Sequence, residues 1–441
     1  MTLPSWCPAT AISSRLSRPP ATPLKPTGKI AVFDPKGETG KWLTGLHVPY
    51  QKVEANADLS PYAVLVVGKA ALTVDGPGPN VSRVRDGLKV IMFEQTAEVL
   101  EKRFGFRVQE YGLRQVFKRV PDHPILAGLD DQNLRDWRGE ATILPPRLTY
   151  EMRPMYGPTV TWCGIDVTRV WRAGCRGNVA SVLIEKPVRG DFLPILDGGF
   201  SLQYSPLLEY REGKGMVLFC QMDVTGRTEA DPAAERLARS IVEYASAWKP
   251  APERTALYVG DPAGKNHLER AGVSVGLYEG GNLSADQVLV VGPGGGQQLA
   301  ACRAVVGHWL QAGGHLLAIG IDEREAAAIL PFKVTMKEAE HISAYFEPFG
   351  LASPLAGIGP ADVHNRDPRQ LSLVSGGAQT IGNGVLARAA GANVVFCQLA
   401  PWKFDYSKQF NLKRTYRRAS FTVARLLAGM GVAGSGTKSR F

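Results

Sequence analysis

The chain has 441 residues, of which 44% are hydrophobic and 21% charged, and it carries a formal net charge of +10. This length allows two or three domains with cores of their own. The longest apolar runs, at 62–68 and 315–321, fall far short of the roughly 18 to 20 residues that span a bilayer, so the sequence predicts no transmembrane segment and no membrane partner. Basic residues are interleaved with carboxylates rather than gathered in a block, which argues against nucleic acid as a partner.

Both ends of the chain look unfolded. The first 27 residues contain six prolines and no acid, so we expect residues 1–28 to be a disordered leader or a broken junction, and 433–441 a disordered tail. The leader lacks the apolar core of a signal peptide, and the sequence indicates no particular cellular compartment. Six cysteines do not make a disulfide framework; Cys163 and Cys175 would pair only in an oxidising compartment.

The remaining sequence repeats itself. Four pairs of segments occur in the same order in the two halves: 29–37 with 256–264, 64–68 with 288–292, 88–95 with 315–322, and 127–138 with 356–369. The first pair reads as a buried strand ending in Asp-Pro-x-Gly, a turn signature, and the second is the same strand VLVVG twice. A fifth pair, the motif Phe-Cys-Gln, closes a strand at 219–221 and again at 396–398. The order predicts an internal duplication.

Strands alternate with helical segments at the start of each repeat, which favours an α/β fold with mostly parallel sheets. Each repeat then ends in a Gly-containing hairpin, at 207–221 and 385–398, and a helix with an apolar stripe. We therefore expect two tandem domains, at 29–250 and 254–432. Matched positions lie 224 to 231 apart at first but 177 apart at Phe-Cys-Gln, which places an insertion of about 54 residues at 136–219.

Little in the sequence indicates catalysis. The turns after the central strands, 93–99 and 320–326, offer neither Cys nor Ser. We interpret Glu94 and Glu323 as acids at helix starts, where the helix dipole favours a carboxylate without a catalytic role. The Gly-Lys steps at 37–42 and 262–267 lack the P-loop spacing, and 290–298 lacks the dinucleotide fingerprint. No histidine pair has metal-binding spacing. The sequence predicts no catalytic residue, metal or cofactor.

Aromatic and basic residues supply the candidate contact sites. Tryptophan beside Asp or Arg is typical both of sugar binding and of packed interfaces. The stretch 411–420 is either a solvated surface or an interface to an acidic partner domain. The candidate interface or sugar-contact residues are Trp137, Trp162, Trp171, Trp402, Arg417 and Arg418.

These segments resemble a known family. The central turn, HPILAGL (123–129) and the final hairpin and helix look like the class I glutamine-amidotransferase-like (flavodoxin-like) fold. The amino-acid sequence at 134–147, 190–223, 363–369 and 394–421 is similar to the C-terminal region of large bacterial β-galactosidase-like proteins of the glycoside hydrolase family 2 type. An active amidotransferase needs a nucleophilic Cys in the central turn, and a His-Glu pair after the last strand. This chain has Glu94-Gln95 and Ile321-Asp322 in the turns, and Gln221 and Gln398 after the strands.

The resemblance therefore implies a non-catalytic C-terminal module of a glycoside hydrolase, serving domain packing, oligomerisation or carbohydrate contact. Its partners would be upstream hydrolase domains or another copy of itself, with carbohydrate as a further ligand. The alternative is a free-standing hydrolase acting on a carbohydrate at a site in the 136–219 insertion, with Asp136, Asp166 or Glu185. Glu185 lies in a strand whose alternation would simply expose it.

Overall fold

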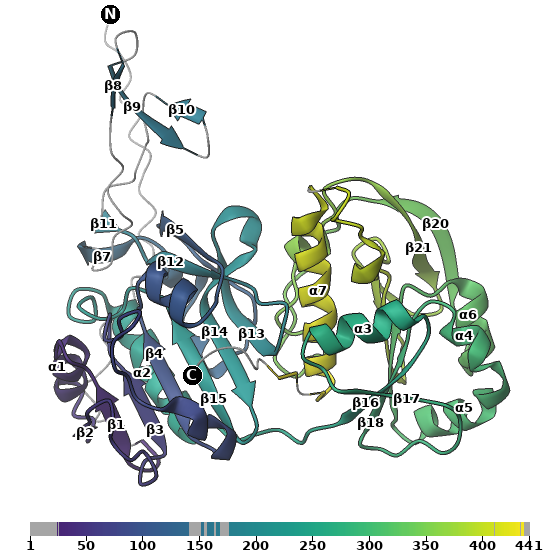
Figure 1. The fold of residues 1–441 in the computed structure, drawn as a ribbon, viewed down its shortest axis with the longest axis horizontal. Helices are drawn as coiled ribbons and strands as arrows, with labels where there is room; N and C mark the ends of the chain where they lie inside the picture. Colours follow the sequence, from purple (N-terminus) through teal and green to yellow (C-terminus); the bar gives the residue numbers. More distant parts are fainter. Residues whose placement is uncertain are drawn as a thin grey trace, which may run out of the picture.

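The computed structural model describes residues 24, 26–140, 151–153, 157–162, 165–167, 176–409, 411–432 and 434–435. The leader up to residue 23, most of the tail and much of 141–175 lie outside these residues, so the predictions made for them are not addressed. The described chain is a mixed α/β fold with two main sheets, one in the N-terminal half (residues 29–250) and one in the C-terminal half (residues 254–432) (Figure 1). Within the described part, no helix is long and apolar enough to cross a membrane.

The N-terminal sheet has a parallel core and an antiparallel extension. In spatial order its strands are β2 (Gln51–Lys52), β1 (Ile30–Phe33), β3 (Val64–Val67), β4 (Lys89–Phe93), β15 (Gly215–Cys220), β14 (Tyr204–Glu212), β12 (Ala180–Glu185) and β5 (Val108–Leu113). The first five are parallel to their neighbours and the rest antiparallel. β13 (Asp191–Gly198) pairs with β14 and with β6 (Phe117–Lys118).

Both faces of this sheet are covered, because its central strands are apolar throughout. Ile30 and Val32 face a core that includes α1 (Glu38–Gly45) and α2 (Pro232–Ala247). Ala31 and Phe33 face the opposite core, which includes the short helices η1 (Val81–Asp86) and η2 (Val99–Arg103). The alternation follows from the two-residue period of a strand.

The C-terminal sheet is built in the same way. Its strands, in spatial order, are β17 (Val275–Leu277), β16 (Thr255–Val259), β18 (Gln287–Val291), β19 (His315–Ile319), β24 (Asn393–Cys397), β23 (Leu386–Arg388) and β22 (Gln379–Ile381). The antiparallel pair β20 (Thr335–His341) and β21 (Arg369–Gly376) forms a sheet of its own. The helices are α3 (Pro262–Arg270), α4 (Gly295–Gln298), α5 (Arg303–Gln311), α6 (Glu323–Ile329) and α7 (Leu412–Gly429).

The two sheets agree in register as well as in strand order. Val64 lies opposite the first residue of β4, and Val288 lies opposite the first residue of β19. Phe219 lies opposite the fourth residue of β4, and Phe396 opposite the fourth residue of β19. The matched sequence segments therefore occupy matched places in the two sheets.

The extra chain of the N-terminal half leaves the main sheet after a short helix that both halves possess. This helix is η4 (Asp131–Leu134) in the N-terminal half and η7 (Pro360–Val363) in the C-terminal half. In the C-terminal half β21 follows almost at once. In the N-terminal half β7 (Trp137–Glu140), β11 (Arg176–Gly177) and a small sheet come before β12 (Figure 1). That small sheet consists of β8 (Glu151–Arg153), β9 (Gly157–Trp162) and β10 (Ile165–Val167).

Candidate functional site

The central turn of the N-terminal half holds a buried carboxyl group. The Glu94 side chain, on a residue only 1% exposed, accepts hydrogen bonds from the backbone N–H and the hydroxyl of Thr225, at 2.8 and 3.1 Å. Burial raises the pKa of Glu94 to about 8, and nearby Asp223 adds to the rise. Our interpretation of Glu94 as an acid at a helix start is wrong, because the helical residues begin only at Ala97 and the partner of Glu94 is Thr225, in the loop after β15.

Gln95 and Gln221 lie beside this carboxyl group and join the ends of neighbouring strands through hydrogen bonds. Gln221 accepts a hydrogen bond from the Gln95 N–H and donates one to the Gln95 carbonyl, both at 2.9 Å. The Gln95 amide in turn donates to the carbonyls of Gly68 and Phe93. All these groups lie at the carboxyl ends of the parallel strands, where α/β folds usually place their ligands. Here the place is filled by the chain's own polar groups.

The cysteines of the Phe-Cys-Gln motifs are unsuited to nucleophilic chemistry. Cys220 and Cys397 are fully buried. Burial raises the pKa of the Cys397 thiol to about 12, and burial together with Glu94 raises that of Cys220 well above its ordinary value. Only a thiolate is a good nucleophile, so both residues act as small apolar side chains.

The central turn of the C-terminal half is a helix cap. Asp322 accepts a hydrogen bond from the Glu325 N–H at 2.8 Å, and Glu325 accepts one from the Asp322 N–H at 3.3 Å. This capping box begins α6. Glu323 lies in the first turn of α6, where it accepts a hydrogen bond from the Met336 N–H. The position expected for Glu323 is therefore correct, and its carboxylate has a structural partner.

The glycines at 292–296 allow close packing rather than phosphate binding. A side-chain carbon on Gly292 would lie 2.2 Å from the Tyr258 hydroxyl, and one on Gly296 would lie 2.5 Å from the Cβ of Glu325. The loop is glycine-rich because α4 packs tightly against its neighbours. In the described part of the chain, no group of three or more His, Cys, Asp or Glu residues is placed to hold a metal ion.

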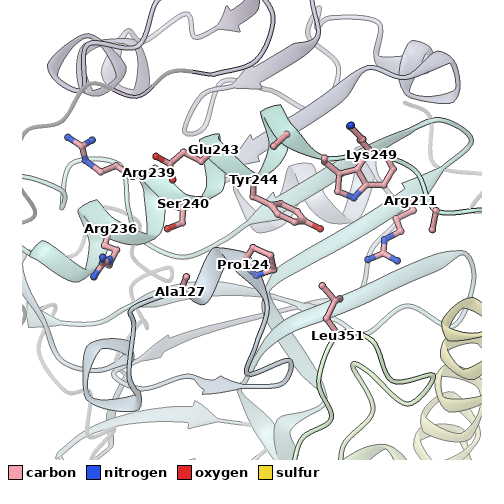
Figure 2. A pocket seen from close by; sticks show the side chains of 13 residues that line it. Pro124, Ala127, Arg211, Arg236, Arg239, Ser240, Glu243, Tyr244, Lys249 and Leu351 are labelled. Carbon is pink, nitrogen blue, oxygen red and sulfur yellow. The ribbon is translucent and has the colours of Figure 1, made fainter.

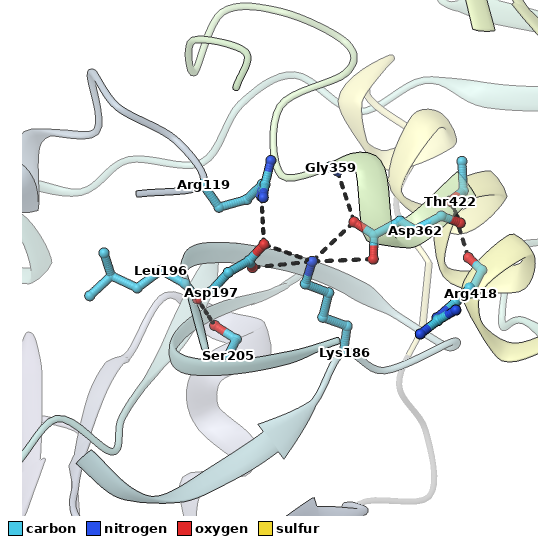
Figure 3. A network of polar contacts seen from close by, with 9 residues as sticks. All are labelled: Arg119, Lys186, Leu196, Asp197, Ser205, Gly359, Asp362, Arg418 and Thr422. Atoms are coloured by element: carbon cyan, nitrogen blue, oxygen red, sulfur yellow. Dashed lines mark hydrogen bonds and ion pairs between the residues drawn. The ribbon is translucent and has the colours of Figure 1, made fainter. Parts of the chain in front are cut away.

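The two halves meet around a buried lysine. Lys186 lies 3.1 Å from a carboxylate oxygen of Asp197 and 3.0 Å from one of Asp362, so its ammonium group bridges a residue of β13 and a residue of η7 (Figure 3). Arg119 holds Asp197 from the other side at 2.6 Å, and the Gly359 N–H donates to Asp362. Lone buried charges are costly, and here each has opposite charges as partners.

Helix α7 adds two more ion pairs between the halves. Arg425 donates to Asp191 of β13 at 2.7 Å, and Arg417 donates to Glu185 of β12 at 2.6 Å. Glu185 is only 4% exposed and also accepts hydrogen bonds from Arg107 and Gln203. The expectation that alternation exposes Glu185 is wrong, because α7 covers the end of β12. All six β12 residues are buried.

A cavity of about 850 Å³ opens between α2 and the linker to the C-terminal half (Figure 2); we call it the α2 cavity. Tyr244 and Arg211 line it, and both contact Glu209, which lies fully buried behind them. Burial alone would raise the pKa of Glu209, but Arg211 and His123 hold it well below its usual range. The carboxylate is thus ionised and neutralised by fixed partners, not poised to take up a proton.

A second cavity, of about 690 Å³, lies at the start of α7, and we call it the basic cavity. Residues of both halves line it: Arg107, Phe200, Ser201, His364, Arg366, Asn411, Lys413, Arg414, Arg417 and Arg418. No aspartate or glutamate occurs among these residues. The strong positive charge makes an anion the natural ligand of this cavity.

The predicted contact residues fall in different places. Trp137 is buried in the N-terminal core and donates to the Asn133 carbonyl at 2.7 Å. Trp402 packs beside His267 and donates to Asp261 at 3.1 Å. Trp162 belongs to β9, outside the main sheets, and Trp171 lies outside the described residues.

Of the predicted contact residues that the structure describes, Arg417 and Arg418 lie together in the basic cavity. Arg418 is 5% exposed, so a solvated surface does not describe it. The sequence analysis missed Lys186, Asp197 and Asp362. Asp197 alone has a local signal, a charge that directly follows the apolar run 192–196, while Lys186 and Asp362 lie close to other polar residues.

Comparison with known proteins adds little. No family model matches the chain, and no curated protein matches it. Among the solved structures that do match, the exo-β-1,4-mannosidase Op5Man5 from Opitutaceae bacterium strain TAV5 is 12% identical, with a TM-score of 0.24. The match covers 47% of this chain and 40% of that chain.

Proposed function

We propose that this chain is a non-catalytic C-terminal module of a β-galactosidase-like glycoside hydrolase. In this proposal the two halves are duplicated amidotransferase-like domains that serve packing, oligomerisation or carbohydrate contact. The observation that carries the proposal is the state of the two central turns. One holds a buried Glu94 with fixed partners, and the other holds the helix cap Asp322.

The alternative, a hydrolase with its site in the 136–219 insertion, has less support. Asp136 pairs with Arg114 and Arg135, and Glu185 pairs with Arg107 and Arg417. Neither acid lines the α2 cavity or the basic cavity. The side chain of Asp166 is not among those that the structure describes. A glycosidase of the usual kind needs two carboxyl groups facing one substrate bond.

Turnover assays test the proposal. The purified chain should release no glutamate from glutamine and should not cleave p-nitrophenyl β-galactoside. The variants Asp136→Asn and Glu185→Gln serve as controls for contaminating activity. Glycosidase activity that survives repurification and disappears in one of these two variants would establish the alternative.

A further inference from the structure

The basic cavity concentrates positive charge, which a single carboxylate, that of Glu185, neutralises in part. Of its cationic residues, Arg107 and Arg417 share the carboxylate of Glu185. Arg366 donates to the Asn411 amide oxygen, and Arg414 lies over the ring of Phe200, 4.8 Å from its centroid. These last two contacts supply no negative charge. A ligand that carried several anionic groups would relieve the repulsion among the guanidinium groups.

Arg418 adds a buried cation to the wall of the cavity. Its side chain lines the cavity although the residue is 95% buried, and its Nε–H group, which is itself closed off from solvent, has no hydrogen-bond partner. One terminal nitrogen lies 2.8 Å from Nδ1 of His364. A buried donor without an acceptor costs free energy, so the guanidinium is incompletely satisfied by the protein alone.

The shape and chemistry of the cavity narrow the class of anion. Five of its side chains are arginines, whose planar groups bind carboxylate or sulfate through two parallel hydrogen bonds. Its volume of about 690 Å³ exceeds what one small ion would fill. Phe200 is 55% exposed and is the only Phe, Tyr or Trp among the described residues that line the cavity. One ring can pack against a sugar, whereas single-stranded nucleic acid is usually held on several stacked rings.

We propose that the basic cavity binds an acidic oligosaccharide, a sugar chain that carries carboxylate or sulfate groups. The choice of a sugar rests on the proposed function; the choice of an anion rests on the cavity alone. In the complex, Arg366, Arg414 and Arg418 would bind the anionic groups, and Phe200 would pack against a sugar ring.

Binding measured by calorimetry at low salt tests the proposal on the full chain. The probes are an oligogalacturonate, a sulfated oligosaccharide of the same length, a neutral oligogalactoside, inorganic sulfate and single-stranded DNA. One or both acidic oligosaccharides should bind, and the stronger of the two identifies the charged group. Neutral sugar should not bind. Equal binding of the neutral sugar, or tighter binding of DNA, would overturn the proposal.

Charge-matched variants then locate the site. Arg414→Glu should weaken binding of the acidic sugar about tenfold or more. Arg324→Glu changes the net charge equally at an exposed position of α6 and should leave affinity within about twofold. Both residues are exposed, so neither change should prevent folding. Equal affinities of the two variants would show that attraction is non-specific and would refute the site.

Phe200→Ala distinguishes a sugar from a simple anion. Removing the ring should weaken the acidic oligosaccharide severalfold and leave the binding of inorganic sulfate unchanged. If both ligands are unaffected, Phe200 has no part in binding and the proposal of a sugar ligand is wrong. The result is separable from the proposed function, because a chain without this site could still be a non-catalytic module, and glycosidase turnover would not affect the binding data.

Discussion

Helices α2 and α7 hold equivalent places in the two halves, each following the last parallel strand of its sheet, yet their arginines differ in environment. Arg236 and Arg239 of α2 line the α2 cavity. Arg418 and Arg425 of α7 are buried, and Arg425 contacts Asp191 of the other half. Helices at the same place in the fold can therefore differ in how deeply their arginines are buried. The burial depends on which segment packs against the helix, and for α7 that segment includes β13.

The largest effect is expected from breaking the buried ion network that joins the two halves beside α7. Lys186→Met leaves Asp197 and Asp362 buried without their shared ammonium group. Removal of one partner from a buried ion pair costs about 3–5 kcal/mol. Urea unfolding should show a loss of this size, or an early transition as the halves separate.

Lys265 provides the matched control, because its ion pair with Glu269 lies on the exposed side of α3. Lys265→Met should change stability by less than about 1 kcal/mol. If Lys186→Met costs no more than this control, the network in Figure 3 does not hold the halves together.

The two central turns differ in burial, and pH should reveal the difference. The pKa of Glu94 is about 8 in the folded chain and near 4.5 when unfolded, so the folded state binds the extra proton between these values. The stability that this proton provides is complete below about pH 4.5 and is lost as pH rises through 8. The loss amounts to at most about 5 kcal/mol.

Glu94→Gln removes this dependence, because an amide remains neutral. The variant should gain stability relative to the parent chain as pH rises from 5 to 9, measured by thermal unfolding. Asp322→Asn in the other half removes an exposed carboxylate and serves as the control variant. If the stability of the parent chain and that of Glu94→Gln change with pH in the same way, the pKa of Glu94 is not raised by burial.

Close approach of the halves at Gly359 gives a smaller effect. A side-chain carbon there would lie 2.3 Å from the guanidinium carbon of Arg119, which Asp197 holds in place. Gly359→Ala should cost about 1–3 kcal/mol through overpacking. Replacing Gly313, where a side-chain carbon would meet no atom within 4 Å, is less suitable as a control because its φ is positive. Gly45→Ala on α1 has open space and an ordinary φ, and should be neutral or slightly stabilising.

The sequence predicted what local pattern determines. Continuous apolar runs located β1, β3, β4 and their counterparts, and the repeated Phe-Cys-Gln motif located the ends of β15 and β24, which the structure places beside β4 and β19. The site residues were less predictable. Glu94 meets Thr225 at a separation of 131 residues, and Lys186 meets Asp362 at a separation of 176. Such contacts depend on tertiary packing and leave no periodic signal in the chain.

The smallest effect is expected at Trp402, which stands near the start of α7. Trp402→Phe keeps the ring beside His267 but removes the hydrogen bond to Asp261. Asp261 still caps α3 through its other carboxylate oxygen, so the cost should be about 1 kcal/mol. Trp137→Phe is the contrasting change, because Trp137 is buried and its loss also leaves a cavity and an unpaired carbonyl at Asn133. Chemical unfolding should rank Trp137→Phe as clearly more destabilising. Equal losses would mean that Trp402, although partly exposed, is packed as tightly as a core residue.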